Sequence, residues 1–219
     1  MTLEVDHLVV GAATLEQGAA WCEATLGVVP AAGGRHALMG THNRLLAIGS
    51  AAFPRAYLEI IAVDPDAPPP ARPRWFGLDE PEVRERLAAA PQLLHWVART
   101  HDLEADLQAS RALGVDPGPV VAAQRETPAG TLRWRLTIPD DGHPLAGGAW
   151  PTLIAWEGPH PSASLPASGV TLVALRLGGL PTGAAAWIGR VAEVVAGGAG
   201  ALEATLETPR GIVTLERRR

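Results

Sequence analysis

The chain has 219 residues, of which 47% are hydrophobic and 19% charged, so it carries enough apolar side chains for the core of one or two small domains. Its net charge is -5 and its 18 basic residues are scattered, which argues against nucleic acid as a partner. The single cysteine, the missing signal-peptide pattern and the lack of a bilayer-length apolar stretch predict a soluble cytoplasmic protein without a membrane partner.

The first elements along the chain form a strand-helix unit. A strand is predicted from Leu3 to Val10, closed by Gly11. A helix should follow, because Thr14 and Gln17 have the spacing of a capping box and Gly27 stands where a left-handed C-cap is wanted. Three further strands are predicted over 35–39, 44–48 and 56–63.

A proline-rich connector separates this unit from the next one. Residues 64–74 (DPDAPPPARPR) cannot form a helix or a central strand, and a short helix is predicted over 79–89, with Pro81 in its first turn. A strand around His95 then leads into a helix with Asp102 as its N-cap and Gly114 at its end. Three strands follow over 120–124, 131–137 and 151–157.

The two strand-helix stretches match residue by residue. His7 and His95 are 88 residues apart, as are Leu15 and Leu103, and the Leu-Gly-Val triplets that follow the helices are 87 apart. Such an ordered set of matches indicates an internal duplication. Each half therefore reads as a βαβββ module.

The C-terminal part resembles an incomplete third copy. After a linker over 158–169 we expect a strand over 170–177, a helix over 182–196, and a hairpin of strands 202–207 and 211–216. This unit contains no histidine. It cannot bury its own apolar side chains, so it should pack on the main sheet or on a second copy of the chain, the latter giving a homodimer.

Four polar residues occupy equivalent places in the two modules. His7 and His95 lie in the first strands, and Glu59 and Glu157 in the last strands. Two imidazoles and two carboxylates suit Zn, Fe, Mn, Ni or Co and leave positions for water or a chelating substrate. For His7, His95 and Glu157 a structural role is the alternative, since histidines in apolar strands are often hydrogen-bonded core groups. Glu59 stands in the apolar run 57–61, where a buried carboxylate without a partner is costly, so it marks either a site or a solvated face.

Several stretches resemble the glyoxalase-like domain family of the vicinal-oxygen-chelate superfamily: VDHLVVGA, GTHNRLLAIG with YLEIIAVDP, LRWRLTIPDDG and LIAWEGPHP. The resemblance covers residues 1 to about 166. It implies an α+β fold in which paired βαβββ modules form a curved mixed sheet around a cavity. It also places metal ligands in the first and last strands of each module, which correspond to His7, Glu59, His95 and Glu157, although Trp96 competes with His95 for its position.

The chain thus divides into a first module (1–63), the connector with its short helix (64–91), a second module (92–157), and the linker with the partial βαββ unit (158–219). Further substrate-binding candidates are expected on the cavity. His42 and Asn43 would form a polar rim or an ordinary turn, and Arg133 and Arg135 share one strand face that is either solvated or binds an anion. Trp150, like Trp75 and Phe76, would serve as a hydrophobic plug or a binding platform.

Two hypotheses about function follow. In the first, the protein is a divalent-metal-dependent lyase, isomerase or dioxygenase acting on a small oxygen-chelating substrate, with Glu59 or Glu157 as the base. In the second, the same cavity binds or sequesters a small, partly aromatic molecule without a metal. The residues alone name neither the substrate nor the metal.

Overall fold

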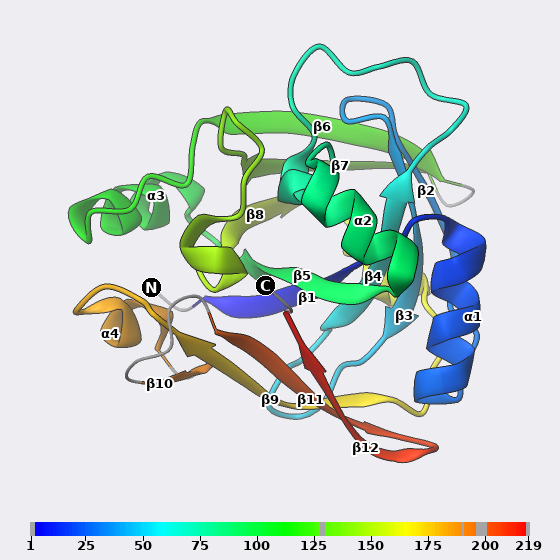
Figure 1. Ribbon diagram of the computed structural model, residues 1–219. Coiled ribbons are helices and arrows are strands. Elements are labelled where there is room, and N and C mark those ends of the chain that lie inside the picture. Colours follow the sequence, from blue (N-terminus) through cyan, green and yellow to red (C-terminus); the bar gives the residue numbers. More distant parts are fainter. Residues whose placement is uncertain (1–2, 128–129, 190, 196–200, 218–219) are drawn as a thin grey trace.

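The computed structural model describes residues 3–127, 130–189, 191–195 and 201–217. Eight strands form a strongly curved sheet in the order β2-β3-β4-β1-β5-β8-β7-β6, and four more form a second sheet in the order β10-β9-β11-β12. The outer strands β2 and β6 of the large sheet approach each other, so the sheet is nearly closed. In Figure 1, β6 and β7 arch over the top, β1 and β5 cross the middle, and the smaller sheet lies beneath them.

The first module has the predicted order of elements. It consists of β1 (Glu4–Gly11), α1 (Leu15–Leu26), β2 (Ala31–His36), β3 (Thr41–Ala47) and β4 (Tyr57–Val63). Thr14 caps α1 by accepting a hydrogen bond from the Gln17 backbone N–H, and Gly27 ends the helix with a φ of 78°. The strand predicted over 35–39 begins earlier and ends at His36, because residues 37–40 form the turn into β3.

The second module repeats this order. It consists of β5 (Gln92–Arg99), α3 (Leu103–Ala112), β6 (Val120–Thr127), β7 (Gly130–Thr137) and β8 (Thr152–Glu157), with a 3-10 turn η2 (Leu145–Gly148) before β8. Asp102 caps α3 through its bond from the Ala105 N–H, as predicted. Between the modules lie a 3-10 turn η1 (Trp75–Gly77) and helix α2 (Pro81–Ala89), which begins two residues later than expected because Glu80 is its N-cap.

The two modules meet where β1 pairs antiparallel with β5. Leu8 lies opposite Trp96 in this pairing, and these two residues are separated by the same 88 positions as the two histidines. At the centre of this strand pair, residues at equivalent positions of the two repeats therefore lie opposite each other. His7 lies opposite Val97 and His95 opposite Val9, so both histidines start on the same face of the sheet, diagonal to each other.

The C-terminal unit differs from its prediction in one element. It contains β9 (Thr171–Gly178), α4 (Ala184–Ile188), β10 (Glu193–Val195), β11 (Leu202–Thr208) and β12 (Gly211–Glu216), preceded by the turn η3 (Pro161–Ser164). The helix predicted over 182–196 was wrong in extent: α4 ends at Gly189, whose φ is 68°, and Glu193–Val195 instead pairs parallel with β9. The hairpin lies within one residue of the predicted bounds.

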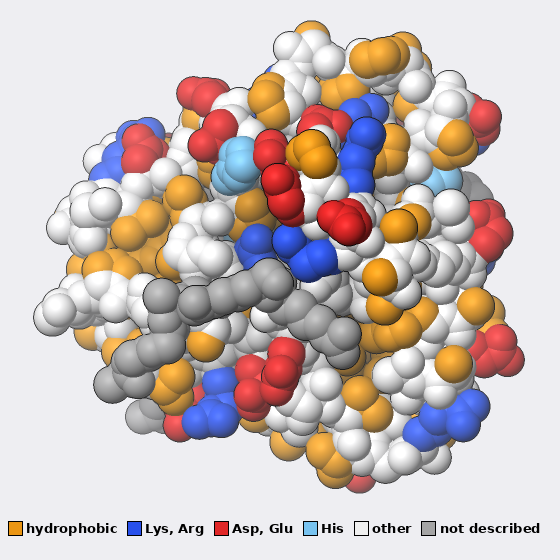
Figure 2. All heavy atoms as spheres, viewed as in Figure 1, with side chains coloured by type: hydrophobic (Ala, Val, Ile, Leu, Met, Phe, Trp, Pro, Cys, Tyr) orange, Lys and Arg blue, Asp and Glu red, His pale blue; other side chains and the backbone are white. Residues whose placement is uncertain are grey.

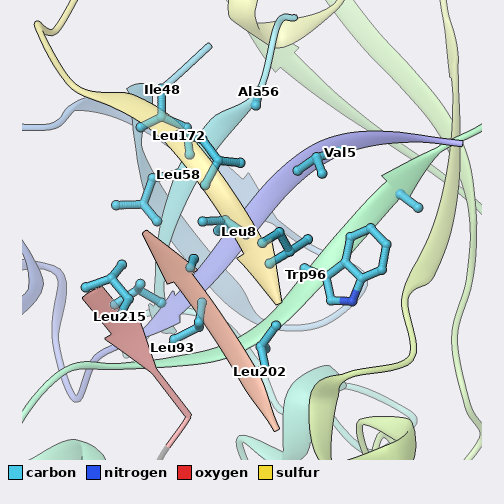
Figure 3. Packing of buried hydrophobic residues seen from close by; sticks show 14 of the residues in the cluster. Val5, Leu8, Ile48, Ala56, Leu58, Leu93, Trp96, Leu172, Leu202 and Leu215 are labelled. Atoms are coloured by element: carbon cyan, nitrogen blue, oxygen red, sulfur yellow. The ribbon is translucent and has the colours of Figure 1, made fainter. Parts of the chain in front are cut away.

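The main core lies between the two sheets. Leu8, Leu58, Leu93 and Trp96 of the large sheet pack against side chains such as Leu172, Leu202 and Leu215 of the small one (Figure 3). Of the two arrangements predicted for the C-terminal unit, the structure shows the one in which it covers the main sheet of its own chain. A second apolar cluster, with Val9, Ile61, Val97 and Trp134, lines the concave face. No helix in the described part of the chain is long and apolar enough to cross a membrane.

Candidate functional site

A polar cluster lies on the concave face of the first module. Adjacent strands β1, β4, β3 and β2 present His7, Glu59, Asn43 and His36, respectively, to a cavity that encloses about 440 Å³ of space between atoms, open solvent included. All four side chains are buried. The remaining wall of the cavity is mostly aromatic and apolar, with Arg125 of β6 reaching in from the far edge of the sheet; its aromatic members are Tyr57, Trp75, Phe76, Trp134 and Trp156.

Glu59 is the centre of this cluster. Its Oε1 accepts a hydrogen bond of 2.6 Å from Nδ2 of Asn43, and its Oε2 lies 3.6 Å from Nε2 of His7. The side chain of Glu59 is only 7% exposed, so its charge depends on these donors. The apolar strand around Glu59 predicted that burial of its carboxylate would be costly. In the structure the side-chain amide of Asn43 offsets this cost by donating a hydrogen bond.

Asn43 and His36 are fixed by a single chain of hydrogen bonds. The Gly34 backbone N–H donates to Oδ1 of Asn43, which leaves Nδ2 facing Glu59 and also Nε2 of His36, 3.3 Å away. Nδ1 of His36 lies 3.1 Å from the Thr41 hydroxyl. Burial lowers the pKa of His36 to about 4, even though the Glu59 charge opposes this shift, so His36 is a neutral acceptor at pH 7.

His7 is oriented by its neighbour Asp6. A β-bulge between Val5 and His7 lets Asp6 turn back, and its Oδ1 lies 2.7 Å from Nδ1 of His7. Burial alone would raise the pKa of Asp6, but hydrogen bonds with His160 and His7 outweigh it and hold the pKa well below its usual range. The ionised Asp6 can only accept, so His7 donates from Nδ1 and its Nε2 faces the cavity.

His160 and Trp156 complete the support of Asp6. Nε1 of Trp156 donates to Oδ2 of Asp6 at 2.9 Å, and Nε2 of His160 lies 2.9 Å from the same oxygen. Although His160 follows β8 in the linker, where a surface position would be expected, it is buried because η3 folds it back onto Asp6. His143, in the loop before η2, is half exposed beside Glu80.

Trp75 and Phe76 divide the concave face into two cavities. Both rings line the first-module cavity and also a second, narrow and mostly apolar cavity that is lined by His95 and Trp150 as well. The rings stack on each other with centroids 5.6 Å apart, and Phe76 also contacts the His95 ring at 5.3 Å. Phe76 adopts a left-handed backbone conformation with φ 62°, unfavourable for a phenylalanine, and its packing on both sides holds it there.

His95 makes its hydrogen bond within the second module. Its Nε2 accepts a hydrogen bond of 3.1 Å from the Thr152 backbone N–H. Burial, with a smaller effect of Arg217, lowers its pKa to about 3, so the ring is neutral. His95 therefore holds β5 and β8 together and does not share the His7–Glu59 cavity.

Glu157 lies apart from the other three predicted ligands. Trp156 takes the cavity-facing place on β8, and the alternation of a strand turns Glu157 to the other side, where it lies 3.9 Å from Arg135. More than half of its side chain is exposed. The prediction that Glu157 joins His7, Glu59 and His95 around one ion is thus not met by this geometry.

The remaining predicted binding residues, apart from Asn43, also lie outside the first cavity. His42 points away from it because Thr41, Asn43 and Leu45 take the buried side of β3. Arg135 pairs with Glu104 on the surface. Arg133 and Glu157 line an adjoining hollow, which shares His36, Trp75 and Trp134 with the first cavity. Trp150 is a buried plug whose ring stacks on Trp187 at 4.9 Å and donates to the Ser110 hydroxyl.

These positions do not fit the divalent ion that the fold family implies. Within residues 3–127, 130–189, 191–195 and 201–217, no group of three or more His, Cys, Asp or Glu side chains is arranged to hold a metal. Only His7 and Glu59 of the four predicted ligands face each other, and Asn43 already donates to Glu59. What the site offers is a carboxylate and an imidazole set in an aromatic wall.

The fold and the duplicated modules define a protein of the glyoxalase type, with its polar site on the first and last strands of one module. The family model described as a glyoxalase-like domain matches residues 5–193. The chain therefore belongs to the glyoxalase-like domain family.

Among solved structures, the chain is similar to a hypothetical protein from Staphylococcus aureus, with 16% identity and a TM-score of 0.55 over 99% of this chain and 87% of the other. Methylmalonyl-CoA epimerase from Mycobacterium tuberculosis aligns with 20% identity and a TM-score of 0.41, over 74% and 92% of the two chains. A variant of the Streptomyces coelicolor methylmalonyl-CoA epimerase, in complex with 2-nitronate-propionyl-CoA, aligns with 18% identity and a TM-score of 0.44, over 73% and 100%. A search of curated proteins found no match.

Proposed function

We propose that this protein binds a small, partly aromatic molecule in the first-module cavity without a metal ion, with Glu59 contacting its polar end. The observation that supports this most is the carboxylate of Glu59, which Asn43 holds in a cavity whose wall is largely aromatic and apolar. Aromatic side chains in such a wall stack on planar ligands. An ionised carboxylate accepts hydrogen bonds and donates none, so the ligand group that contacts it must carry an O–H or N–H. The favoured ligand is therefore an aromatic or conjugated ring that carries a hydroxyl or N–H group.

The same site has the parts for proton transfer. Asp6 fixes His7 so that its Nε2 faces the cavity, 3.6 Å from Oε2 of Glu59. An imidazole oriented by a buried carboxylate, beside a second carboxylate, is an arrangement used in general acid–base catalysis. An isomerisation or a lyase step that moves a proton is the reaction class this pair supports.

A thermal-shift screen with simple phenols and N–H heteroaromatic compounds tests the proposal. A ligand at 100 times its Kd should stabilise the folded protein by about 2.7 kcal/mol. Glu59→Gln, which replaces the acceptor oxygen with a donor, should abolish the shift. Glu157→Gln is the matched control and should leave it intact. No stabilisation by these compounds, or equal shifts in both variants, would contradict the proposal.

A second candidate is the divalent-metal-dependent lyase, isomerase or dioxygenase of the first hypothesis. It is favoured by one distance: His7 Nε2 and Glu59 Oε2 are 3.6 Å apart, which is the spacing of two ligands on one ion. Elemental analysis of protein purified without chelator or affinity metal separates the candidates. Stoichiometric Zn, Fe, Mn, Ni or Co that disappears in His7→Ala plus Glu59→Ala would replace the metal-free proposal with this one.

A further inference from the structure

A groove on another face of the molecule has no role in the site described above. It lies between α1, α2, the start of β5 and β12, encloses about 950 Å³ of space when open solvent is included, and shares no lining residue with the first-module cavity. Figure 1 is viewed with α2 and β12 towards the reader. On the same face, Figure 2 shows basic and acidic side chains close together over α2, and hydrophobic atoms between α2 and β12.

One wall of the groove contains a buried amide without a partner. Gln92, at the start of β5, is only 6% exposed. Neither its Nε2 nor its Oε1 has a hydrogen-bond partner among the described residues, and the same holds for the buried Nε of Arg86. Buried polar groups in folded proteins are almost always paired, so unpaired atoms beside a groove indicate groups that a ligand can satisfy.

The groove also carries one charge of each sign. Arg86 of α2 and Glu216 of β12 both line it, yet neither makes an ion pair with any residue in the described part of the chain. A second guanidinium is close by: burial, together with the nearby charge of Arg86, lowers the pKa of Arg217. An anion bound at Arg86 would reduce this repulsion between the two arginines.

Most of the remaining lining is apolar. Trp21 of α1, Leu93 of β5 and Leu215 of β12 contribute to it, together with the polar residues Thr25 and Thr214. Leu93 and Leu215 are buried parts of the main core, so this surface is rigid. A ligand that fits would carry two opposite charges at one end and an apolar side chain at the other.

We propose that the groove binds a small zwitterion with an apolar side chain, of which a free α-amino acid is the simplest example. Its carboxylate is held by Arg86 and by Nε2 of Gln92. Its ammonium group donates to Oε1 of Gln92 and to Glu216. The apolar side chain lies against Trp21, Leu93 and Leu215.

Titration of the ¹⁵N-labelled full-length chain with L-leucine, followed by NMR, tests this proposal. Saturable shifts should appear for the backbone amides of Gln92 and Glu216. Arg86→Gln and Glu216→Gln should each weaken binding at least tenfold. Arg84→Gln on the same helix and Glu203→Gln, the cross-strand neighbour of Glu216, lie outside the groove and should bind like the wild type.

Two analogues separate the charges. 4-Methylpentanoate lacks the ammonium group and isopentylamine lacks the carboxylate, and both should bind at least tenfold more weakly than L-leucine. The proposal is overturned if L-leucine shows no saturable binding up to about 10 mM. It is also overturned if Arg86→Gln and Glu216→Gln, shown to be folded by their melting curves, bind as well as the wild type.

Discussion

At the scale of single residues, burial decides the charge states around the site. His36 and His95 are enclosed and neutral, whereas Asp6 stays ionised because His7, His160 and Trp156 supply donors to it. The difference lies in the balance of burial and hydrogen bonds: for the two histidines burial is the largest effect, whereas the hydrogen bonds from His7 and His160 outweigh the burial of Asp6. This pattern leaves Glu59 and His7 as the polar pair beside the open cavity.

These charge states predict acid sensitivity. The pKa values of His36 and His95 are about 4 and about 3 in the folded protein, below the unfolded value of about 6.5. The unfolded chain therefore binds protons first as the pH falls, and stability should drop between about pH 6.5 and pH 4, by about 1.4 kcal/mol per pH unit for each histidine. Asp6, with its lowered pKa, loses its contribution only below about pH 4.

Urea unfolding at several pH values measures the slope of the unfolding free energy against pH. His95→Gln keeps an acceptor for the Thr152 N–H and removes one titrating group, so it should flatten the slope by about half. His143→Gln, at a half-exposed surface position, should leave the slope unchanged. An unfolding free energy that stays constant from pH 6.5 to pH 4 would refute the assignment.

At the scale of elements, the connector contributes more than a link between modules. Its turn η1 inserts Trp75 and Phe76 between the two cavities, and Gln17 of α1 donates to the Leu87 carbonyl at the end of α2. The aromatic pair was predicted as a plug or a platform. Both rings are buried and border two cavities, as expected of a plug, and their role as a binding platform stays a prediction.

Replacing Phe76 with alanine should therefore join the two cavities. The loss of a buried ring predicts a decrease in the unfolding free energy of about 3 kcal/mol, and the binding of a hydrophobic dye such as ANS should increase. Phe76→Leu fills much of the space and should lose less than half as much stability. If ANS binding to Phe76→Ala stays at the wild-type level, the ring does not separate the cavities.

Local sequence patterns predicted helices and strands well where the residues of a single helix or strand determine its bounds and its buried face. Thr14, Gly27 and Asp102 marked helix ends correctly, and Glu59 was found because a carboxylate in an apolar strand needs a partner. Residues whose roles depend on tertiary contacts were missed: His36 and Asp6 join the site through a turn and a bulge. His42 and Glu157 were placed wrongly because a shift of one residue moves a side chain to the other face of a strand.

At the scale of the whole molecule, the two sheets share one core. The large sheet is covered on its convex face by the C-terminal unit, and its concave face carries the candidate site. Hydrogen bonds connect the units as well: the Leu172 backbone N–H donates to the Ile48 carbonyl at 2.8 Å, and the Arg217 side chain donates to the Leu94 carbonyl. The cytoplasmic location and the homodimer stay predictions.

Because the C-terminal unit covers this core, a chain that ends after Ala167 should not fold normally. Truncation would expose Leu8, Leu58, Leu93 and Trp96, which are all fully or almost fully buried now. A contiguous apolar face of this kind drives aggregation or leaves a molten state that keeps secondary structure but lacks fixed packing. Near-UV circular dichroism and a thermal melt of the fragment check this, with the full-length chain as the reference. A soluble fragment that melts cooperatively would show that the first two modules form a core of their own.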